Sequence, residues 1–238
     1  MQDGERRFSG QLAEEYDLIT LAYPDFEAFQ WRMVEEIRQT ATGTTSEPTQ
    51  LLEIGTGNGF TTHMLLELPR VTVVTIDNDP EMVRQAREQF NSSDRTEVVE
   101  ADALEYLSSR EEASVDVVAS AFTLHNLERE YRDAVEREIY RVLTPGGLFA
   151  NADKYAPDGE QRFEALRFQV ERFFDAFVPR DKLDLLRKWV THNIDDQSPR
   201  YVMLASEAPA RLTSIGFSQV AVSDRTHMQA VLTARKPR

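Results

Sequence analysis

The sequence predicts an α/β fold, in which a doubly wound, mostly parallel sheet of seven strands has an antiparallel hairpin at one edge. Three observations lead to this prediction. From residue 50 onward, short apolar runs alternate with segments of helical periodicity, as in βαβ units whose sheet is covered on both faces. A glycine-rich turn follows the first apolar run, and the last two runs lie close together in the chain.

A helical cap is predicted ahead of the sheet. Residues 8–40 carry apolar side chains at helical spacing on both sides of a break at Tyr23–Pro24. The small polar stretch 41–49 is typical of a linker. We therefore expect residues 1–45 to form a cap that is connected to the first strand by a short polar segment.

Strands and helices then alternate. The predicted strands are 50–54, 71–77, 96–102, 115–122, 147–154, 217–224 and 227–236. The predicted helices between them are 60–68, 80–90, 103–110 and 128–143, with a turn at Pro145–Gly147 before the fifth strand. Pro80 falls in the first turn of its helix, where the missing N–H costs little. The final two strands alternate in polarity, which favours an antiparallel pair.

Residues 157–205 interrupt this alternation. A Phe-rich helix is predicted over 160–177 and a second helix over 181–190, and a third helix over 206–215 precedes the hairpin. The Phe-rich helix either covers the core, or in part roofs an apolar pocket or forms a dimer contact. The expected organisation is one domain, divided into a helical cap (1–45), a ligand-binding core (50–155), a helical insertion (156–205) and a C-terminal helix with its hairpin (206–238).

Composition excludes several classes of function. The 238 residues include no Cys, which rules out disulfides, thiolate nucleophiles and cysteine metal sites. The net charge of −14 disfavours direct nucleic-acid binding, which depends on clustered Lys and Arg. No window is apolar enough for a membrane span, and the N-terminus lacks a signal core, so we expect a cytoplasmic protein.

The stretch 51-LLEIGTGNGFTTHMLLEL-68 indicates a ligand loop between a strand and a helix. It contains no Lys or Arg, so it is not a phosphate-binding P-loop, and its third glycine comes one residue too early for a dinucleotide fingerprint. Glu53, just before the loop, would repel a pyrophosphate but attract an ammonium group. We therefore expect a ligand that has an amine and needs no phosphate.

Two further acids end the next two predicted strands. Asp77 is placed to accept hydrogen bonds from both hydroxyls of a ribose, and Asp102 to accept one from a base amine. An amine, a ribose and a base amine without any phosphate occur together in S-adenosylmethionine. The three carboxylates thus predict this compound as the cofactor.

At this point the chain resembles the class I S-adenosylmethionine-dependent methyltransferases. LLEIGTGNG resembles their motif I, TIDNDPEM their ribose segment, EADALEY their adenine segment, VASAFTLHNLE the segment after strand four, and YRVLTPGGLF the turn before strand five. The pattern from Phe8 to Pro24 is similar to the cap of small-molecule members. The resemblance covers roughly 8–155 and, more weakly, 205–235, and it implies a Rossmann-like fold.

The resemblance and the three acids together predict a set of cofactor-binding residues. They are Tyr16, Tyr23, Glu53, Gly55, Thr56, Gly57, Gly59, Asp77, Asn78, Met82, Asp102, Ala103 and Phe122, with Met82 packed on the adenine. Simpler alternatives stay open. The glycines could form a bare tight turn, Asp77 and Asp102 could be helix N-caps, and the two tyrosines could be packing residues.

Methyl transfer from a sulfonium needs a base only if the nucleophile carries a proton of high pKa. His125 follows the fourth predicted strand, and Asp153, Lys154 and Tyr155 follow the fifth. We take His125 and Tyr155 as the catalytic candidates, although a histidine in such a loop can also simply pack.

The remaining histidines are weaker candidates. His192 and His227 rank below His125, and His63 is expected to pack on its helix. A metal site after strand four would have only Asn126 and Glu128 to draw on, so no metal is predicted.

The favoured function is methyl transfer to a small, apolar or aromatic acceptor, held in a closed apolar cavity beside His125 and Tyr155. An open basic groove would argue against this. The chain also resembles carboxy-S-adenosylmethionine synthases of tRNA wobble-uridine modification, in which an Arg holds the donor carboxylate and Arg200 is the candidate here. A third reading is a non-catalytic module that binds S-adenosylmethionine. A homodimer is possible under each of them.

Overall fold

The computed structural model describes residues 15–23, 25–41 and 47–238 of the chain. Within these residues, seven strands form one sheet in the order β3-β2-β1-β4-β5-β7-β6. The strands are β1 (Thr49–Ile54), β2 (Val71–Asp77), β3 (Thr96–Glu100), β4 (Val115–Ala121), β5 (Leu143–Lys154), β6 (Ser218–Thr226) and β7 (Gln229–Arg235). The first five strands are parallel, and β7 is antiparallel to both β5 and β6. The predicted doubly wound sheet with an antiparallel edge hairpin is confirmed.

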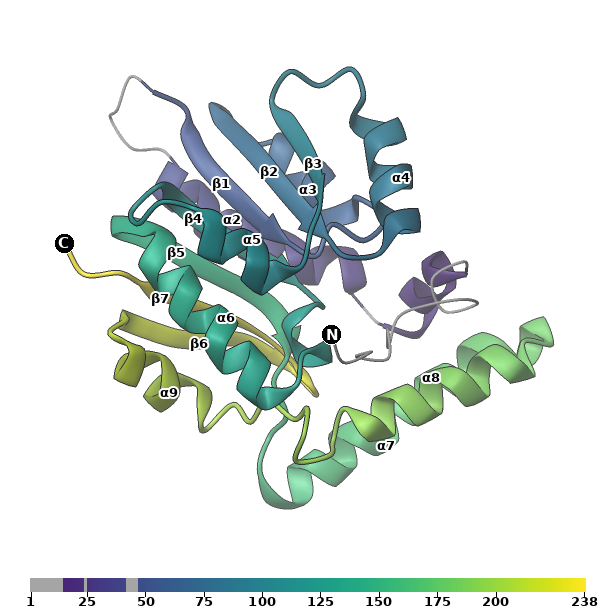
Figure 1. The fold of residues 1–238 in the computed structure, drawn as a ribbon. Coiled ribbons are helices and arrows are strands. Elements are labelled where there is room, and N and C mark those ends of the chain that lie inside the picture. Colours follow the sequence, from purple (N-terminus) through teal and green to yellow (C-terminus); the bar gives the residue numbers. More distant parts are fainter. Residues whose placement is uncertain (1–14, 24, 42–46) are drawn as a thin grey trace.

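Helices cover both faces of this sheet (Figure 1). The helical elements are η1 (Tyr16–Ala22), α2 (Phe26–Ala41), α3 (Phe60–Leu66), α4 (Pro80–Phe90), α5 (Ala103–Ser109), η2 (Leu124–Asn126), α6 (Arg129–Val142), α7 (Gly159–Phe177), η3 (Val178–Arg180), α8 (Leu183–Asp195) and α9 (Ala208–Ile215). One core cluster joins the sheet to α5, α6 and α9, and a second joins its other face to α2 and α3.

Local sequence accounts for where these elements begin and end. Asp79 caps α4 by accepting hydrogen bonds from the N–H groups of Glu81 and Met82, and Pro80 then occupies the first turn. The fifth strand starts at Leu143, four residues before the predicted start, because the Pro–Gly–Gly segment is taken into the strand with a register shift against β4. Helix α8 runs to Asp195, beyond the predicted end at 190, so it carries His192 with it.

The insertion forms a helical hairpin of α7 and α8 that extends away from the sheet beside η1 (Figure 1). A third cluster, including Phe173, Phe177 and Trp189, packs the hairpin against Ile19 and Tyr23 of the cap. Phe173 and Phe177 therefore cover a core, as one alternative predicted, whereas Phe163 and Phe174 are largely exposed.

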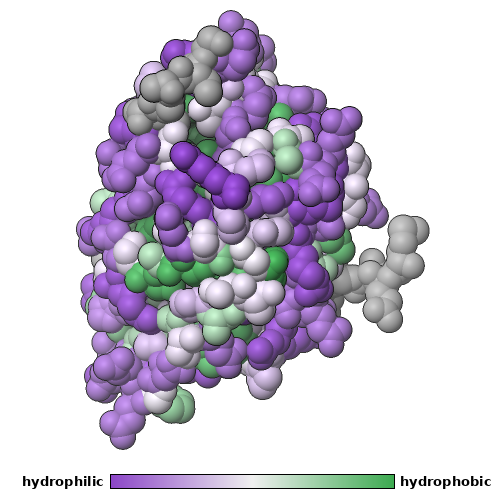
Figure 2. Space-filling view, turned by 90° about the vertical axis from the view of Figure 1, so that its left-hand side faces the viewer, coloured by the Kyte–Doolittle hydropathy of each residue, from purple (hydrophilic) through white to green (hydrophobic). Residues whose placement is uncertain are grey.

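The surface is largely hydrophilic on the face that Figure 2 shows. Figure 2 shows a face on which hydrophilic side chains predominate, with hydrophobic ones gathered in a band across its middle. Among the described helices, none has the length and apolar character needed to cross a membrane.

Candidate functional site

The glycine-rich loop lies at the carboxyl edge of the parallel strands, between β1 and α3. Gly55, Gly57 and Gly59 all have positive φ, at 87°, 51° and 82°, which side chains disfavour. A Cβ on Gly55 would collide with the Thr123 side chain, and one on Gly59 would lie 2.7 Å from Gln89 Oε1. Within the part of the chain that the structure describes, nothing lies within 4 Å of the equivalent point on Gly57. The loop is thus a tight turn that leaves its middle glycine open to a ligand.

Glu53 lies beneath this loop with none of its side chain exposed. The hydroxyls of Thr62 and Thr75 donate to its Oε2 over 2.5 and 2.7 Å, while its Oε1 has no hydrogen-bond partner among the described residues. Burial raises the pKa of this carboxyl to about 7, although the two hydroxyls oppose the rise. Glu53 therefore ties β1 to α3 and β2, and its contact with a ligand ammonium stays a prediction.

Thr56 extends this buried hydrogen-bond chain. Its Oγ1 lies 2.6 Å from Thr75 Oγ1, and since Thr75 donates to Glu53, Thr56 is the donor of this bond. The residue is 3% exposed. Thr56 thus supports the loop from below.

Asp77 ends β2 beside the loop. Its two oxygens accept hydrogen bonds from the backbone N–H groups of Gly57 and Asp79, over 2.8 and 2.9 Å. Burial raises the pKa of the carboxyl, and these two bonds oppose the rise. Each carboxylate oxygen can accept a second bond, so Asp77 keeps the capacity to bind a pair of hydroxyls. Next in the chain, Asn78 is exposed and Met82 is buried in α4.

Asp102 caps α5. Its Oδ1 accepts from the N–H groups of Leu104 and Glu105 and, over 2.5 Å, from the Tyr131 hydroxyl. The N-cap alternative is therefore correct for this oxygen, and Oδ2 is the atom that a base amine could reach. Ala103, the first helical residue, is half-buried.

Phe122 follows β4 with a positive φ of 49° and lies in a cluster of aromatic rings. Phe26 stacks on it with ring centroids 5.2 Å apart, and Tyr23 meets it edge-on at 5.6 Å. Tyr23 is 5% exposed, so its packing role is confirmed while ligand contact stays a prediction. Tyr16 begins η1, but its side chain lies outside the described residues, as does Phe8 of the cap pattern.

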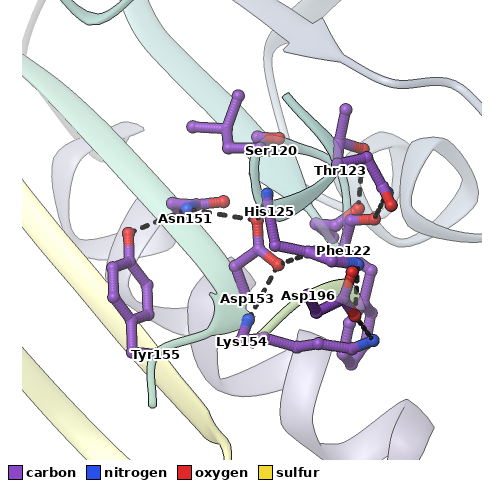
Figure 3. A network of polar contacts seen from close by, with 12 residues as sticks. Ser120, Phe122, Thr123, His125, Asn151, Asp153, Lys154, Tyr155 and Asp196 are labelled. Atoms are coloured by element: carbon purple, nitrogen blue, oxygen red, sulfur yellow. Dashed lines mark hydrogen bonds and ion pairs between the residues drawn. The ribbon is translucent and has the colours of Figure 1, made fainter. Parts of the chain in front are cut away.

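His125 lies in η2, just beyond β4, and is paired with Asp153 of β5 (Figure 3). Its Nδ1 is 2.6 Å from Asp153 Oδ1, and its backbone N–H donates to Asp153 Oδ2 over 3.2 Å. His125 and Asp153 are 4% and 0% exposed. Because the carboxylate accepts the hydrogen of Nδ1, the neutral ring presents an unprotonated Nε2. Arg132 of α6 supports this segment by donating to the carbonyls of Leu124 and Leu127.

A second buried ion pair lies on the other side of the imidazole. Lys154 Nζ donates to Asp196 Oδ2 over 2.7 Å, and the same oxygen lies 4.0 Å from His125 Nε2. Burial opposes the charge on Lys154, but Asp196 and the Tyr23 hydroxyl outweigh it, so the pKa of Lys154 lies above its usual range. Lys154 is thus a permanent cation that joins β5 to the end of α8.

Tyr155 is fully buried on the α6 side of β5. Its hydroxyl accepts from Asn151 Nδ2 over 2.9 Å, and the same amide group lies 3.5 Å from Asp153 Oδ2 (Figure 3). Burial, with Asp153 and Glu136 nearby, raises the pKa of Tyr155 well above its usual value. Among the described residues, the hydrogen bonds that lead from Tyr155 to His125 pass through Asn151 and Asp153, and a direct catalytic role of Tyr155 stays a prediction.

The other predicted polar candidates lie apart from this network. Asn126 donates to the Phe122 carbonyl, and exposed Glu128 pairs with Arg200. His63 is exposed on α3, and His227 is exposed and stacks on Phe168.

One group among the described residues has metal-ligand geometry. Ligand atoms of His125, His192 and Asp196 all lie within 4.8 Å of one another. The Lys154 ammonium already binds Asp196, however, so a metal ion would have to displace a cation of fixed charge. We assign no metal to this group.

The closed apolar cavity expected beside His125 and Tyr155 stays a prediction, and an open groove lies beside η1 and α2. This groove has a volume of about 550 Å³ and is lined by residues of η1 and α2, by Asp25 and by Phe60. It is not basic, since its charged lining residues are Asp25 and Glu27. The observation that would have argued against a small-molecule acceptor is thus absent from this groove.

The sequence did not predict Asp196 or its buried ion pair with Lys154. Asp196 follows α8 and meets β5 across 42 positions of sequence, and it has no motif around it. One feature of the sequence could have indicated this pair: Lys154 lies at a strand end, where a buried ammonium needs an acidic partner.

Comparison with known proteins shows what this chain is similar to. A family model described as a methyltransferase domain matches residues 51–147. The carboxy-S-adenosyl-L-methionine synthase of Photorhabdus laumondii is 26% identical over 78% of this chain and 73% of its own length. The malonyl-[acyl-carrier protein] O-methyltransferase of Geobacter sulfurreducens is 28% identical over 87% of this chain and 70% of its own.

Solved structures show the same fold. The CurJ carbon methyltransferase superposes with a TM-score of 0.63 at 17% identity, over 88% of this chain and 54% of that one. A methyltransferase from Aquifex aeolicus superposes with a TM-score of 0.59 at 19% identity, over 92% of this chain and 97% of that one. Three carboxy-S-adenosyl-L-methionine synthases align with this chain over 63% to 73% of their own length. Part of each of these relatives therefore has no counterpart in the alignment.

Proposed function

We propose, from the premise that the chain is a class I S-adenosylmethionine-dependent methyltransferase, that it methylates a small-molecule acceptor whose proton is taken by His125. The cofactor supplies an activated methyl group on a sulfonium. What the chain must add is the position of the acceptor and a place for its proton. The observation that carries the proposal is the buried His125–Asp153 pair at the carboxyl edge of the sheet.

The residues at the loop fit the cofactor. The backbone above Gly57 is open, Glu53 Oε1 is buried without a described partner, and Asp77 retains acceptor capacity toward hydroxyls. We propose that Asp77 holds the ribose, that Asp102 Oδ2 accepts from the adenine amine and that Met82 packs on the base. Asn78 and Ala103 would border the same nucleoside.

His125 has the features of a general base. Asp153 fixes its ring and keeps the hydrogen on Nδ1, which leaves the lone pair of Nε2 for an acceptor proton. A proton on Nε2 would create an imidazolium between Asp153 and Asp196, where two carboxylates stabilise its charge. We propose that Tyr155 and Asn151 act as positioning residues, because they hold Asp153 and do not reach the imidazole.

Charge within the buried cluster favours a protic acceptor. Asp153 and Asp196 carry two negative charges and Lys154 one positive charge, all at 6% exposure or less. An acceptor that gives its proton to His125 adds a positive charge to a cluster with a negative excess, which is favourable in a low-dielectric interior. An O–H, N–H or acidic C–H acceptor meets this condition.

The test uses S-adenosylmethionine that carries a deuterated methyl group. Incubation with the low-mass and the macromolecular fraction of a cell extract, followed by mass spectrometry, is expected to label a compound in the low-mass fraction. His125→Asn should lower this labelling by about 10²-fold or more while cofactor affinity stays within about twofold. Label found only in the macromolecular fraction would overturn the small-molecule acceptor. Unchanged turnover in His125→Asn would overturn the base.

A carboxy-S-adenosylmethionine synthase activity is the second candidate, because several curated relatives carry that name. Its candidate clamp, Arg200, pairs with Glu128, and both side chains are largely exposed. Mass spectrometry of the ligand that is retained through purification tests this candidate. A ligand heavier than S-adenosylmethionine by one carboxyl group would favour the synthase.

We also propose a cytoplasmic location, because a chain without Cys suits a reducing compartment. Residues 156–205 are proposed to act as a lid over the acceptor. The exposed Phe163 and Phe174 on α7 are the place where a homodimer contact would be sought.

A further inference from the structure

The open groove has an aromatic lining and an acidic rim. Tyr23, Phe26, Trp31 and Phe60 contribute rings to the cavity of about 550 Å³. A second cavity of about 330 Å³ shares Glu27, Trp31 and Phe60 with the first, so the two are parts of one groove along α2 and the start of α3. Trp31 and Phe60 are half-buried and keep part of each side chain available to a ligand.

The charged residues that line this groove are of one sign at neutral pH. They are Asp25, Glu27 and Glu67, all exposed, and His63 and Tyr23 are the other titratable residues of the lining. Among the described residues, no Lys or Arg forms an ion pair with these three carboxylates. Their charge is therefore available to a bound cation.

The groove adjoins the buried cluster through Tyr23. Lys154 Nζ lies 5.6 Å from the centre of the Tyr23 ring, which also lines the groove. From Lys154 the chain of contacts continues through Asp196 to His125 Nε2, over 2.7 and 4.0 Å. The Tyr23 ring, the Lys154 ammonium and the Asp196 carboxylate thus lie in sequence between the groove and the proposed base.

We propose that this groove binds an organic ammonium group, and that the methyl acceptor carries it. The second part rests on the proposed function. Aromatic faces attract cations, most strongly when the cation is alkylated and weakly hydrated, and carboxylates at the rim add Coulombic attraction. A bare inorganic cation would gain little from the rings. The combination of Trp31, Phe60, Asp25 and Glu27 therefore selects an alkylammonium group.

The test compares choline with 3,3-dimethylbutan-1-ol, which has the same shape without the charge. Saturation-transfer NMR on the methyl protons of each probe is carried out on the full chain at constant ionic strength. Choline is expected to bind at least about fivefold more tightly than the alcohol. Choline binding should shift the indole NMR signal of Trp31. The signal of Trp189, the other of the two Trp residues, should not shift, because that residue is 2% exposed.

Matched variants distinguish binding of choline in the groove from the general attraction of a cation to an acidic protein. Glu27→Gln and Trp31→Leu are each expected to weaken choline several-fold, whereas Trp31→Phe should restore most of the affinity. Glu35→Gln, exposed on the same helix but outside the groove, removes the same charge and should change nothing. Equal binding of the two probes, or equal losses in Glu27→Gln and Glu35→Gln, would overturn the proposal.

The experiments distinguish failure of the ammonium-binding proposal from failure of the proposed methyl transfer. If choline binds as expected but no methyl transfer is found in any extract fraction, the cation site stands and the proposed reaction falls. If a labelled product without any cationic nitrogen is identified and choline does not bind, the reaction stands and the groove proposal falls.

Discussion

Glu53→Gln tests how the buried acid beneath the glycine loop contributes to stability. The pKa of Glu53 rises from its usual 4.5 to about 7, chiefly because the side chain is removed from water. The folded state therefore binds more protons than the unfolded state between these two values, and the free energy of unfolding falls as pH rises through this window. The stability linked to protonation is fully present below pH 4.5 and lost above pH 7.

The magnitude follows from the same values. A rise of the Glu53 pKa from 4.5 to about 7 corresponds to about 3 kcal/mol in the free energy of unfolding. Glutamine cannot ionise, so the free energy of unfolding of Glu53→Gln should lack this pH dependence. We expect the wild-type chain to lose about 3 kcal/mol relative to the variant between pH 4.5 and 8. The absolute stability of the variant can move either way, because an amide replaces the acceptor of two Thr hydroxyls.

Urea unfolding at a series of pH values between 4.5 and 8 measures this difference. Glu164→Gln, an exposed acid on α7, is the matched control and should follow the wild-type curve. A wild-type minus Glu53→Gln difference that is flat within about 0.5 kcal/mol would refute the reasoning. It would mean that Glu53 is hydrated or paired in the native state.

Three further outcomes are expected. Asp77→Ala should weaken S-adenosylmethionine by about ten- to a hundredfold in calorimetry, since it removes charge-assisted hydrogen bonds, and undiminished affinity would contradict the ribose assignment. Asp153→Asn should lower kcat with little change in cofactor affinity, and an altered pH profile of kcat would separate this from plain misfolding. Lys154→Met should lower the free energy of unfolding by about 3–5 kcal/mol because it removes the ammonium partner of the buried Asp196 carboxylate, and the double change Lys154→Met/Asp196→Leu should recover much of that loss.

The elements of the fold were predictable because their signals are local. Helical and alternating periodicities extend over whole segments such as 71–77 and 80–90, and the structure has β2 and α4 within these same limits. The strand-end acids were predictable for a related reason, since parallel strands bring their carboxyl ends to one edge. His125 and Asp153 meet because β4 and β5 are adjacent in the sheet.

Side-chain direction and tertiary contacts account for what was missed. Tyr155 is held by Asn151, four residues earlier in the chain, so position at a strand end did not decide where its side chain goes. Asp196 reaches Lys154 through the packing of the helical hairpin, which no pattern in the sequence encodes. The open groove depends on how η1 and α2 meet, a relation that periodicity does not describe.

The ion pair between Lys154 and Asp196 restricts how this enzyme could acquire a new substrate. Exchanging residues 156–205 for a segment of a different protein would remove Asp196 and leave the Lys154 ammonium buried without this partner. A productive graft would have to bring its own acid or change Lys154 in the same step. The helical hairpin and the end of β5 are therefore expected to diversify together, and chimaeras that keep this ion pair should be recovered from recombination libraries more often than those that break it.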